Sequence, residues 1–154
     1  MRITFTFLTA AAAALLAGSC ERKSDFRPVA SVKQLMEATV APSADAIFDA
    51  VGTVVSSSGV EEIAPKNDKE WTAVRNSALN LAESGNLLMI GHRARDNREW
   101  IRMSQALVDV AVVAVKAADA KDPAALFDAG AHVHDVCEQC HSRYWSEAGA
   151  APKP

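Results

Sequence analysis

Apolar residues recur at intervals of three and four along most of the chain, which is the period of an amphipathic α-helix. The stripe between 67 and 90 begins at a capping Asn67 or Asp68, and a second stripe occupies residues 97–120. Their apolar positions are Trp71, Val74, Ala78, Leu81, Gly85 and Leu88 in the first, and Trp100, Met103, Leu107, Val110, Ala114 and Ala117 in the second. Both stripes predict helices that bury one face, so Trp71 and Trp100 are expected in the core.

Two further helices are predicted on either side of these stripes. Apolar residues from Ser31 to Ser56 indicate a first helix, in which Pro42 removes one backbone hydrogen bond and should cause a kink or a break. Asp122-Pro123 is a cap followed by proline at the first helical position, and the helix it begins should continue to about Trp145.

No stretch of the sequence shows an alternation of period two, so the predicted fold class is all-α. Four amphipathic helices of similar length pack best as an antiparallel four-helix bundle, placed at residues 31–147. Residues 20–30 are expected to be a polar tether and residues 148–154 a flexible tail. The net charge of −3 gives no basic excess, which argues against a nucleic-acid partner.

The N-terminus has the pattern of a secretory signal over residues 1–19, with one basic residue, an apolar stretch and small residues at its end. The following Cys20 completes a sequence that is similar to a bacterial lipobox, whose cysteine is lipidated. Lipid on Cys20 would attach the protein to a membrane facing the periplasm. Ordinary cleavage near Ser19, which would leave an unmodified thiol, is the alternative.

The run Cys137-Glu138-Gln139-Cys140-His141 carries the most chemical information in the sequence. Two cysteines three residues apart, followed directly by histidine, are the attachment pattern of a c-type haem. On a helix these three side chains share one face, so both sulfurs can reach the same edge of a porphyrin. His141 would then bind the iron from the proximal side.

The same two cysteines could instead form a dithiol redox pair or half of a zinc site. Zinc requires four ligands, and the sequence has no second Cys-x-x-Cys pair and no His-x-x-x-His pair. A thioredoxin-like dithiol would need alternating strands and helices, which the pattern does not predict. One covalent haem c is therefore the predicted cofactor.

A haem motif near the C-terminus of an all-helical chain resembles the class II c-type cytochromes, which are cytochrome c′ and its low-spin relatives. The matching residues are Cys137, Cys140, His141 and Tyr144, together with the segment Val32–Met36 on the first helix. The resemblance implies a haem inside a four-helix bundle, with Met36 in the region of the distal iron face. Relatives often pair through their first two helices, so a homodimer stays open.

The sequence departs from that family after the aromatic residue of the motif. Where cytochrome c′ commonly has a basic residue, this chain has Trp145, and Arg143 lies before Tyr144 instead.

The distal iron ligand must come from a helix other than the one that carries His141. This excludes His134 and disfavours His132, which lie on the same helix. The candidates that remain are Met36, Met89, Met103 and His92, of which Met36 is preferred on the resemblance and on the thioether chemistry of its side chain. Met103 belongs to a core stripe, Met89 lies one step off the other stripe, and His92 is expected in a solvated loop.

Methionine and histidine ligands would make the protein an electron carrier between periplasmic or membrane redox proteins, and not an enzyme. If Met36 only fills the core, five-coordinate iron could bind nitric oxide or another small gas. Arg93, Arg95 and Arg98 form a basic cluster that is expected to be a solvated loop. The alternative functions for this cluster are docking of an acidic redox partner and contact with the haem propionates.

Overall fold

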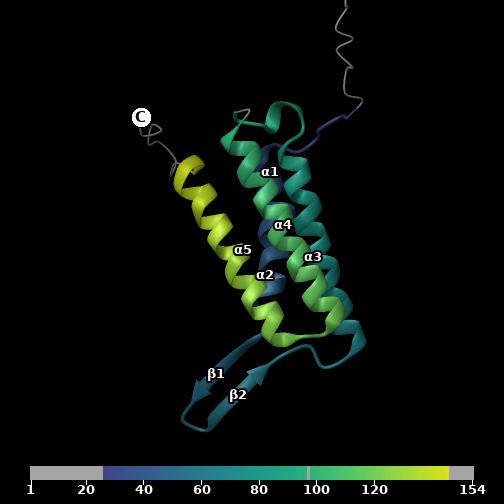
Figure 1. Ribbon diagram of the computed structural model, residues 1–154, viewed down its shortest axis with the longest axis vertical. Coiled ribbons are helices and arrows are strands. Elements are labelled where there is room, and N and C mark those ends of the chain that lie inside the picture. The colour runs from purple at the N-terminus through teal and green to yellow at the C-terminus, as the bar shows by residue number, and fades with distance from the viewer. Residues whose placement is uncertain (1–25, 97, 146–154) are drawn as a thin grey trace, which may run out of the picture.

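The structure is a computed structural model that describes residues 26–96 and 98–145. Within these residues four helical arms pack against one another and alternate in direction, and a β-hairpin projects from one end of the bundle (Figure 1). The all-helical prediction is thus correct for the bundle and wrong for the hairpin. The predicted signal, Cys20 and the tail from residue 148 lie outside the described residues. No helix in the described part of the chain has the length and hydropathy needed to cross a membrane.

The first arm consists of three consecutive helical segments, namely α1 (Val32–Leu35), a π-helical segment η1 (Met36–Val40) and α2 (Ala41–Phe48). Ser31 and Gln34 form a capping box at its start. The predicted disturbance at Pro42 takes the form of the π turn, in which the Ala41 N–H bonds to the carbonyl of Met36 five residues earlier. A proline ring clashes with the carbonyl four residues before it in a regular α-helix, and the wider turn relieves that clash.

The first arm ends at Phe48, eight residues before the predicted end at Ser56. The chain then forms strand β1 (Gly52–Ser56) and strand β2 (Gly59–Ile63), which pair in antiparallel register with Gly52 opposite Ile63. Five of the ten strand residues are β-branched, and such residues favour a pleated conformation. The helical interpretation failed because two valines spaced by three were taken as a helical stripe.

The other three arms follow the predicted ranges closely. They are α3 (Asp68–Leu88), α4 (Glu99–Ala120) and α5 (Pro123–Tyr144). The Asn67 side chain caps α3, and the Asp122 carboxylate accepts two backbone hydrogen bonds at the start of α5. These caps satisfy orphan N–H groups, which explains why the sequence located both starts correctly.

The helices surround one apolar core. α4 lies between α3 and α5, and α2 contacts both α3 and α5, so the four arms close a ring. The α3–α4 pair is especially tight at Gly85, where an added Cβ would lie 2.6 Å from a Val108 methyl and 2.9 Å from the Ser104 carbonyl. The fully buried large side chains include Ile47, Leu81, Leu126 and Val133. Trp71 and Trp100 are buried, as predicted.

Candidate functional site

A cavity of about 660 Å³ lies between the first arm and the C-terminal half of α5. Most of its lining is apolar, and its volume falls within the range of small-molecule and cofactor sites. The side chains that carry its chemistry are Met36, Met103, Cys137, Cys140, His141, Tyr144 and Trp145. At this end of the bundle α5 diverges from its neighbours (Figure 1), whereas Leu126, Ala129 and Val133 in its N-terminal half are buried.

One wall of the cavity contains the whole Cys-x-x-Cys-His motif. Cys137, Cys140 and His141 lie in unbroken α-helix, all three are half-buried, and all three line the same cavity. Helical spacing therefore places the motif on one face, as predicted. Both cysteines are free thiols, and burial raises the pKa of each. The two cysteines therefore do not form a disulfide with each other, and the apolar surroundings disfavour their thiolate forms.

The opposite wall is formed by the first arm, whose lining residues repeat every four positions. The apolar series is Val32, Met36, Val40, Ala44 and Phe48. In an α-helix a step of four residues overshoots a full turn by about 40°, so such a series would drift around the helix. The π turn η1 has more residues per turn and compensates for this drift. The same local distortion that accommodates Pro42 thus keeps Met36 and Phe48 on one cavity-facing surface.

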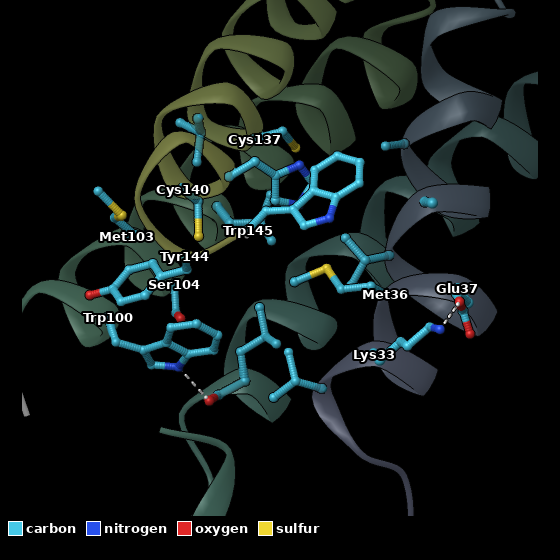
Figure 2. Close-up of a pocket in the computed structure, with 18 of the residues that line it drawn as sticks. Lys33, Met36, Glu37, Trp100, Met103, Ser104, Cys137, Cys140, Tyr144 and Trp145 are labelled. Carbon is cyan, nitrogen blue, oxygen red and sulfur yellow. Dashed lines mark hydrogen bonds and ion pairs between the residues drawn. The ribbon is translucent and has the colours of Figure 1, made fainter. Parts of the chain in front are cut away.

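Met36 projects across the cavity toward the wall that bears the motif. Figure 2 shows its side chain extending from the first arm in the direction of Cys137, Cys140 and Trp145. Met103 also lines the cavity, but it comes from α4, the helix that packs along α5. The remaining candidates, Met89, His92, His132 and His134, are absent from the lining. Of these, His134 is an exposed residue of α5 whose ring lies edge-on to Phe48.

A polar network joins the end of α5 to the loop before α4. The Tyr144 hydroxyl donates a hydrogen bond to the Asp96 carboxylate, which also accepts the backbone N–H groups of Arg98 and Trp100. The bond from Tyr144, together with the backbone bond from Trp100, lowers the pKa of Asp96 to about 2. The Tyr144 and Trp100 rings meet edge-to-face at 4.9 Å, and the Trp100 indole donates to the Leu88 carbonyl. This network holds one side of the cavity in place.

The prediction of a solvated loop is wrong for Arg93. Only 5% of this residue is exposed, and its guanidinium donates to the carbonyls of Ala30 and Leu87. The short 3₁₀ helix η2 (Gly91–Arg93) turns the side chain inward, where it satisfies a carbonyl of the last turn of α3. Arg95 and Arg98 are exposed, as expected, but Arg95 also lines the cavity.

The residues of the cavity fit a covalently attached haem. An imidazole on one wall and a thioether sulfur on the wall opposite are donors suited to haem iron, and the two thiols beside the imidazole suit attachment of the porphyrin. The remaining lining is mainly aliphatic and aromatic and contains few charged groups, namely Lys33, Glu37, Asp45 and Arg95. Within the described part of the chain, no three His, Cys, Asp or Glu side chains gather into a group that could hold a metal ion.

Comparison with known proteins found no matching family model, no matching curated protein and no matching solved structure.

Several cavity residues were missed by the sequence analysis. The period-four series from Val32 to Phe48 is visible in the sequence, but the predicted stripe of the first helix omits its members Ala44 and Phe48. Trp145 is predicted only as the end of the last helix and as a departure from the cytochrome c′ motif, yet it lines the cavity and its ring lies 5.0 Å from that of His141. Asp96 has no sequence signal, because only the fold brings it to Tyr144, 48 residues away.

Proposed function

We propose that this protein is a periplasmic c-type cytochrome with one haem, which carries single electrons between redox partners. The observation that carries the proposal is one cavity that contains the complete Cys-x-x-Cys-His motif on one wall and Met36 on the other. A haem bound there would supply an iron that alternates between two oxidation states. As a carrier, the protein would convert no substrate of its own.

Each residue of the motif has a definite role in this proposal. Cys137 and Cys140 would each add a sulfur to one vinyl carbon and a hydrogen to the other, a step that needs no oxidant. His141 would ligate the iron on one side and Met36 on the other. The aliphatic side chains around them would limit the access of water to a bound haem.

Both proposed ligands lie in helical segments, which favours a rigid site. His141 lies in the last turn of a continuous helix of 22 residues, and Met36 lies in a helical arm fixed by buried Leu35 and Val40. Ligands held by packed helices change position little between oxidation states, which favours fast electron transfer. This rigidity supports a carrier.

The experiment that tests this proposal is absorption spectroscopy of the exported protein, purified from a bacterium that matures c-type cytochromes. We expect a haem that stays with the polypeptide under denaturing conditions and is lost in the C137A/C140A variant. The oxidised protein should show the weak far-red band of methionine sulfur on ferric haem iron. A colourless protein would contradict the proposal.

The methionine variants identify the distal ligand. Met36→Ala should abolish the far-red band and allow the reduced protein to bind carbon monoxide. Met89→Ala is the matched control outside the cavity, and Met103→Ala tests the second methionine of the lining. Loss of the band in Met103→Ala alone would transfer the ligand role to Met103. A wild-type protein that is high-spin and binds carbon monoxide would instead favour the five-coordinate, gas-binding alternative.

A further inference from the structure

The cavity end of the molecule carries an exposed group of arginines. Arg95 lines the cavity, and Arg98 follows in the same loop. Arg143 comes from α5, and its guanidinium lies 5.6 Å from the centre of the Tyr144 ring. The Asp96 carboxylate accepts hydrogen bonds from the Tyr144 hydroxyl and from the backbone N–H of Arg98. Arg95 directly precedes Asp96, so the three arginines are all next to this hydrogen-bond network. We call Arg95, Arg98 and Arg143 the arginine face.

The acids near this face are already engaged. Asp96 accepts hydrogen bonds from Tyr144 and from backbone N–H groups, and Glu99 forms an ion pair with Arg102. Among the described residues, the three side chains of the arginine face form no ion pair. Asp96 and Glu99 offset part of the charge of Arg143 without pairing with it, and the face presents an excess of positive charge beside the cavity.

The opposite end of the bundle has the reverse charge. Residues 49–70, which include the hairpin, contain five acidic and two basic residues, and the whole chain has a net charge of −3. The hairpin and the loop before α4 lie at opposite ends of the bundle (Figure 1), so this acidic segment is remote from the arginine face. A negatively charged partner would be attracted to the cavity end even though the protein as a whole is negative.

An exposed aromatic residue joins the arginine face to the proposed iron ligand. Trp145 is 69% exposed, and its ring packs edge-on against His141 at 5.0 Å. A partner seated on this surface would lie close to the iron, where electron transfer is fastest. Exposed aromatic residues and arginines are also the residue types enriched in protein interfaces.

From these observations we propose that the arginine face and Trp145 form the docking surface for an acidic face of a partner redox protein. This inference rests on the proposed electron-carrier function and specifies the charge of the partner. It excludes the far end of the bundle as the site of electron exchange.

The inference is tested with two small oxidants of opposite charge, hexacyanoferrate(III) and tris(phenanthroline)cobalt(III). Each takes one electron from the reduced holoprotein, and stopped-flow absorption gives the second-order rate constant at several ionic strengths. If exchange occurs at the arginine face, the rate with the anion should fall as salt is added, and the rate with the cation should rise. The net charge of −3 predicts the opposite signs, so the two cases are distinct.

Charge-removing variants locate the site of exchange. R95Q/R98Q/R143Q should lower the rate constant with the anion about tenfold at low salt and reverse its salt dependence. K66Q/K69Q/K116Q removes the same charge from exposed lysines at the other end and should retain the wild-type sign. The double variant R95Q/R98Q preserves the contact between Arg143 and Tyr144, and it replaces the triple variant if that variant is misfolded. It should lower the rate constant with the anion by less than the triple variant does.

Poly-L-glutamate serves as the acidic polypeptide probe. It should slow the reaction of the wild type and of the lysine variant with hexacyanoferrate, but not that of the arginine variant. An anion rate that rises with salt in the wild type, or an equal response of the two triple variants, would overturn the inference. Absence of haem would instead refute the proposed function, because no electron exchange could then be observed.

Discussion

The two halves of α5 have the same sequence pattern and different surroundings. Leu126, Ala129 and Val133 in the first half are almost completely buried against the bundle. Val136 and Cys140 continue the same stripe, yet they are half-buried and line the cavity. The first half of α5 thus belongs to the closed end of the molecule and the second half to the cavity end.

This difference shows what a hydrophobic stripe can establish. Apolar residues spaced by three and four indicate which face of a helix turns inward. They do not indicate whether that face contacts another helix or a cavity. The distinction comes from the type of residue on the stripe. The closed end has only aliphatic residues, whereas the cavity end adds Cys137, Cys140 and Tyr144, which have chemistry beyond packing.

The largest effect is expected from Leu126→Ala at the closed end. The Leu126 side chain is completely buried, and its truncation should lower the free energy of unfolding by about 2 to 5 kcal/mol, because the surrounding helices cannot close the space. Urea denaturation followed by circular dichroism measures this change. Val136→Ala, on the same stripe at the cavity end, is the matched control and should cost less than about 1 kcal/mol. Equal losses for the two variants would mean that the ends do not differ in packing.

A smaller effect is expected from Tyr144→Phe at the cavity end. The Tyr144 hydroxyl is the main cause of the low pKa of Asp96, about 2, so its removal should raise that pKa toward 3.8. The backbone N–H groups of Trp100 and Arg98 should keep it below 3.8. Nuclear magnetic resonance titration of the Asp96 carboxyl carbon measures the shift.

The hydrogen bond between Tyr144 and Asp96 also determines how the stability of the fold depends on pH. Because the folded-state pKa of Asp96 is depressed, its contribution to stability is fully present above pH 3.8 and is lost as the pH falls through about 2. Stability should therefore fall less between these values in Tyr144→Phe than in the wild type. An unchanged Asp96 pKa in the variant would show that the hydroxyl does not bond to this carboxylate in solution.

Predictability differs between local and long-range features. The starts of α3 and α5 were predictable because the Asn67 and Asp122 caps act within a few residues. The shared face of Cys137, Cys140 and His141 follows from helical geometry alone. By contrast, the inward turn of Arg93 depends on the carbonyl of Ala30, which is 63 residues away. Such partners have no signal in a single sequence.

The hairpin could not be predicted because its residues show neither a clear helical period nor the clear alternation of a half-buried strand. All positions of β1 and β2 except Gly52 are exposed, so no buried face imposes a clear alternation on the sequence. Val55 and Val60, directly opposite each other, are 76% and 67% exposed. A two-stranded hairpin without a covered face is only marginally stable.

The smallest effect is therefore expected from removal of the hairpin. Gly52 and Ile63 are partners in the register, so residues 53–62 can be replaced by Asn-Gly, which closes a tight turn between them. The buried Val51 is retained, and the free energy of unfolding should change by less than about 1 kcal/mol. Thermal denaturation measures this change, with Leu126→Ala as the reference for a true core residue. A loss above about 2 kcal/mol would mean that the hairpin covers the closed end in solution, and the contrast between an independent hairpin and a packed bundle would then be wrong.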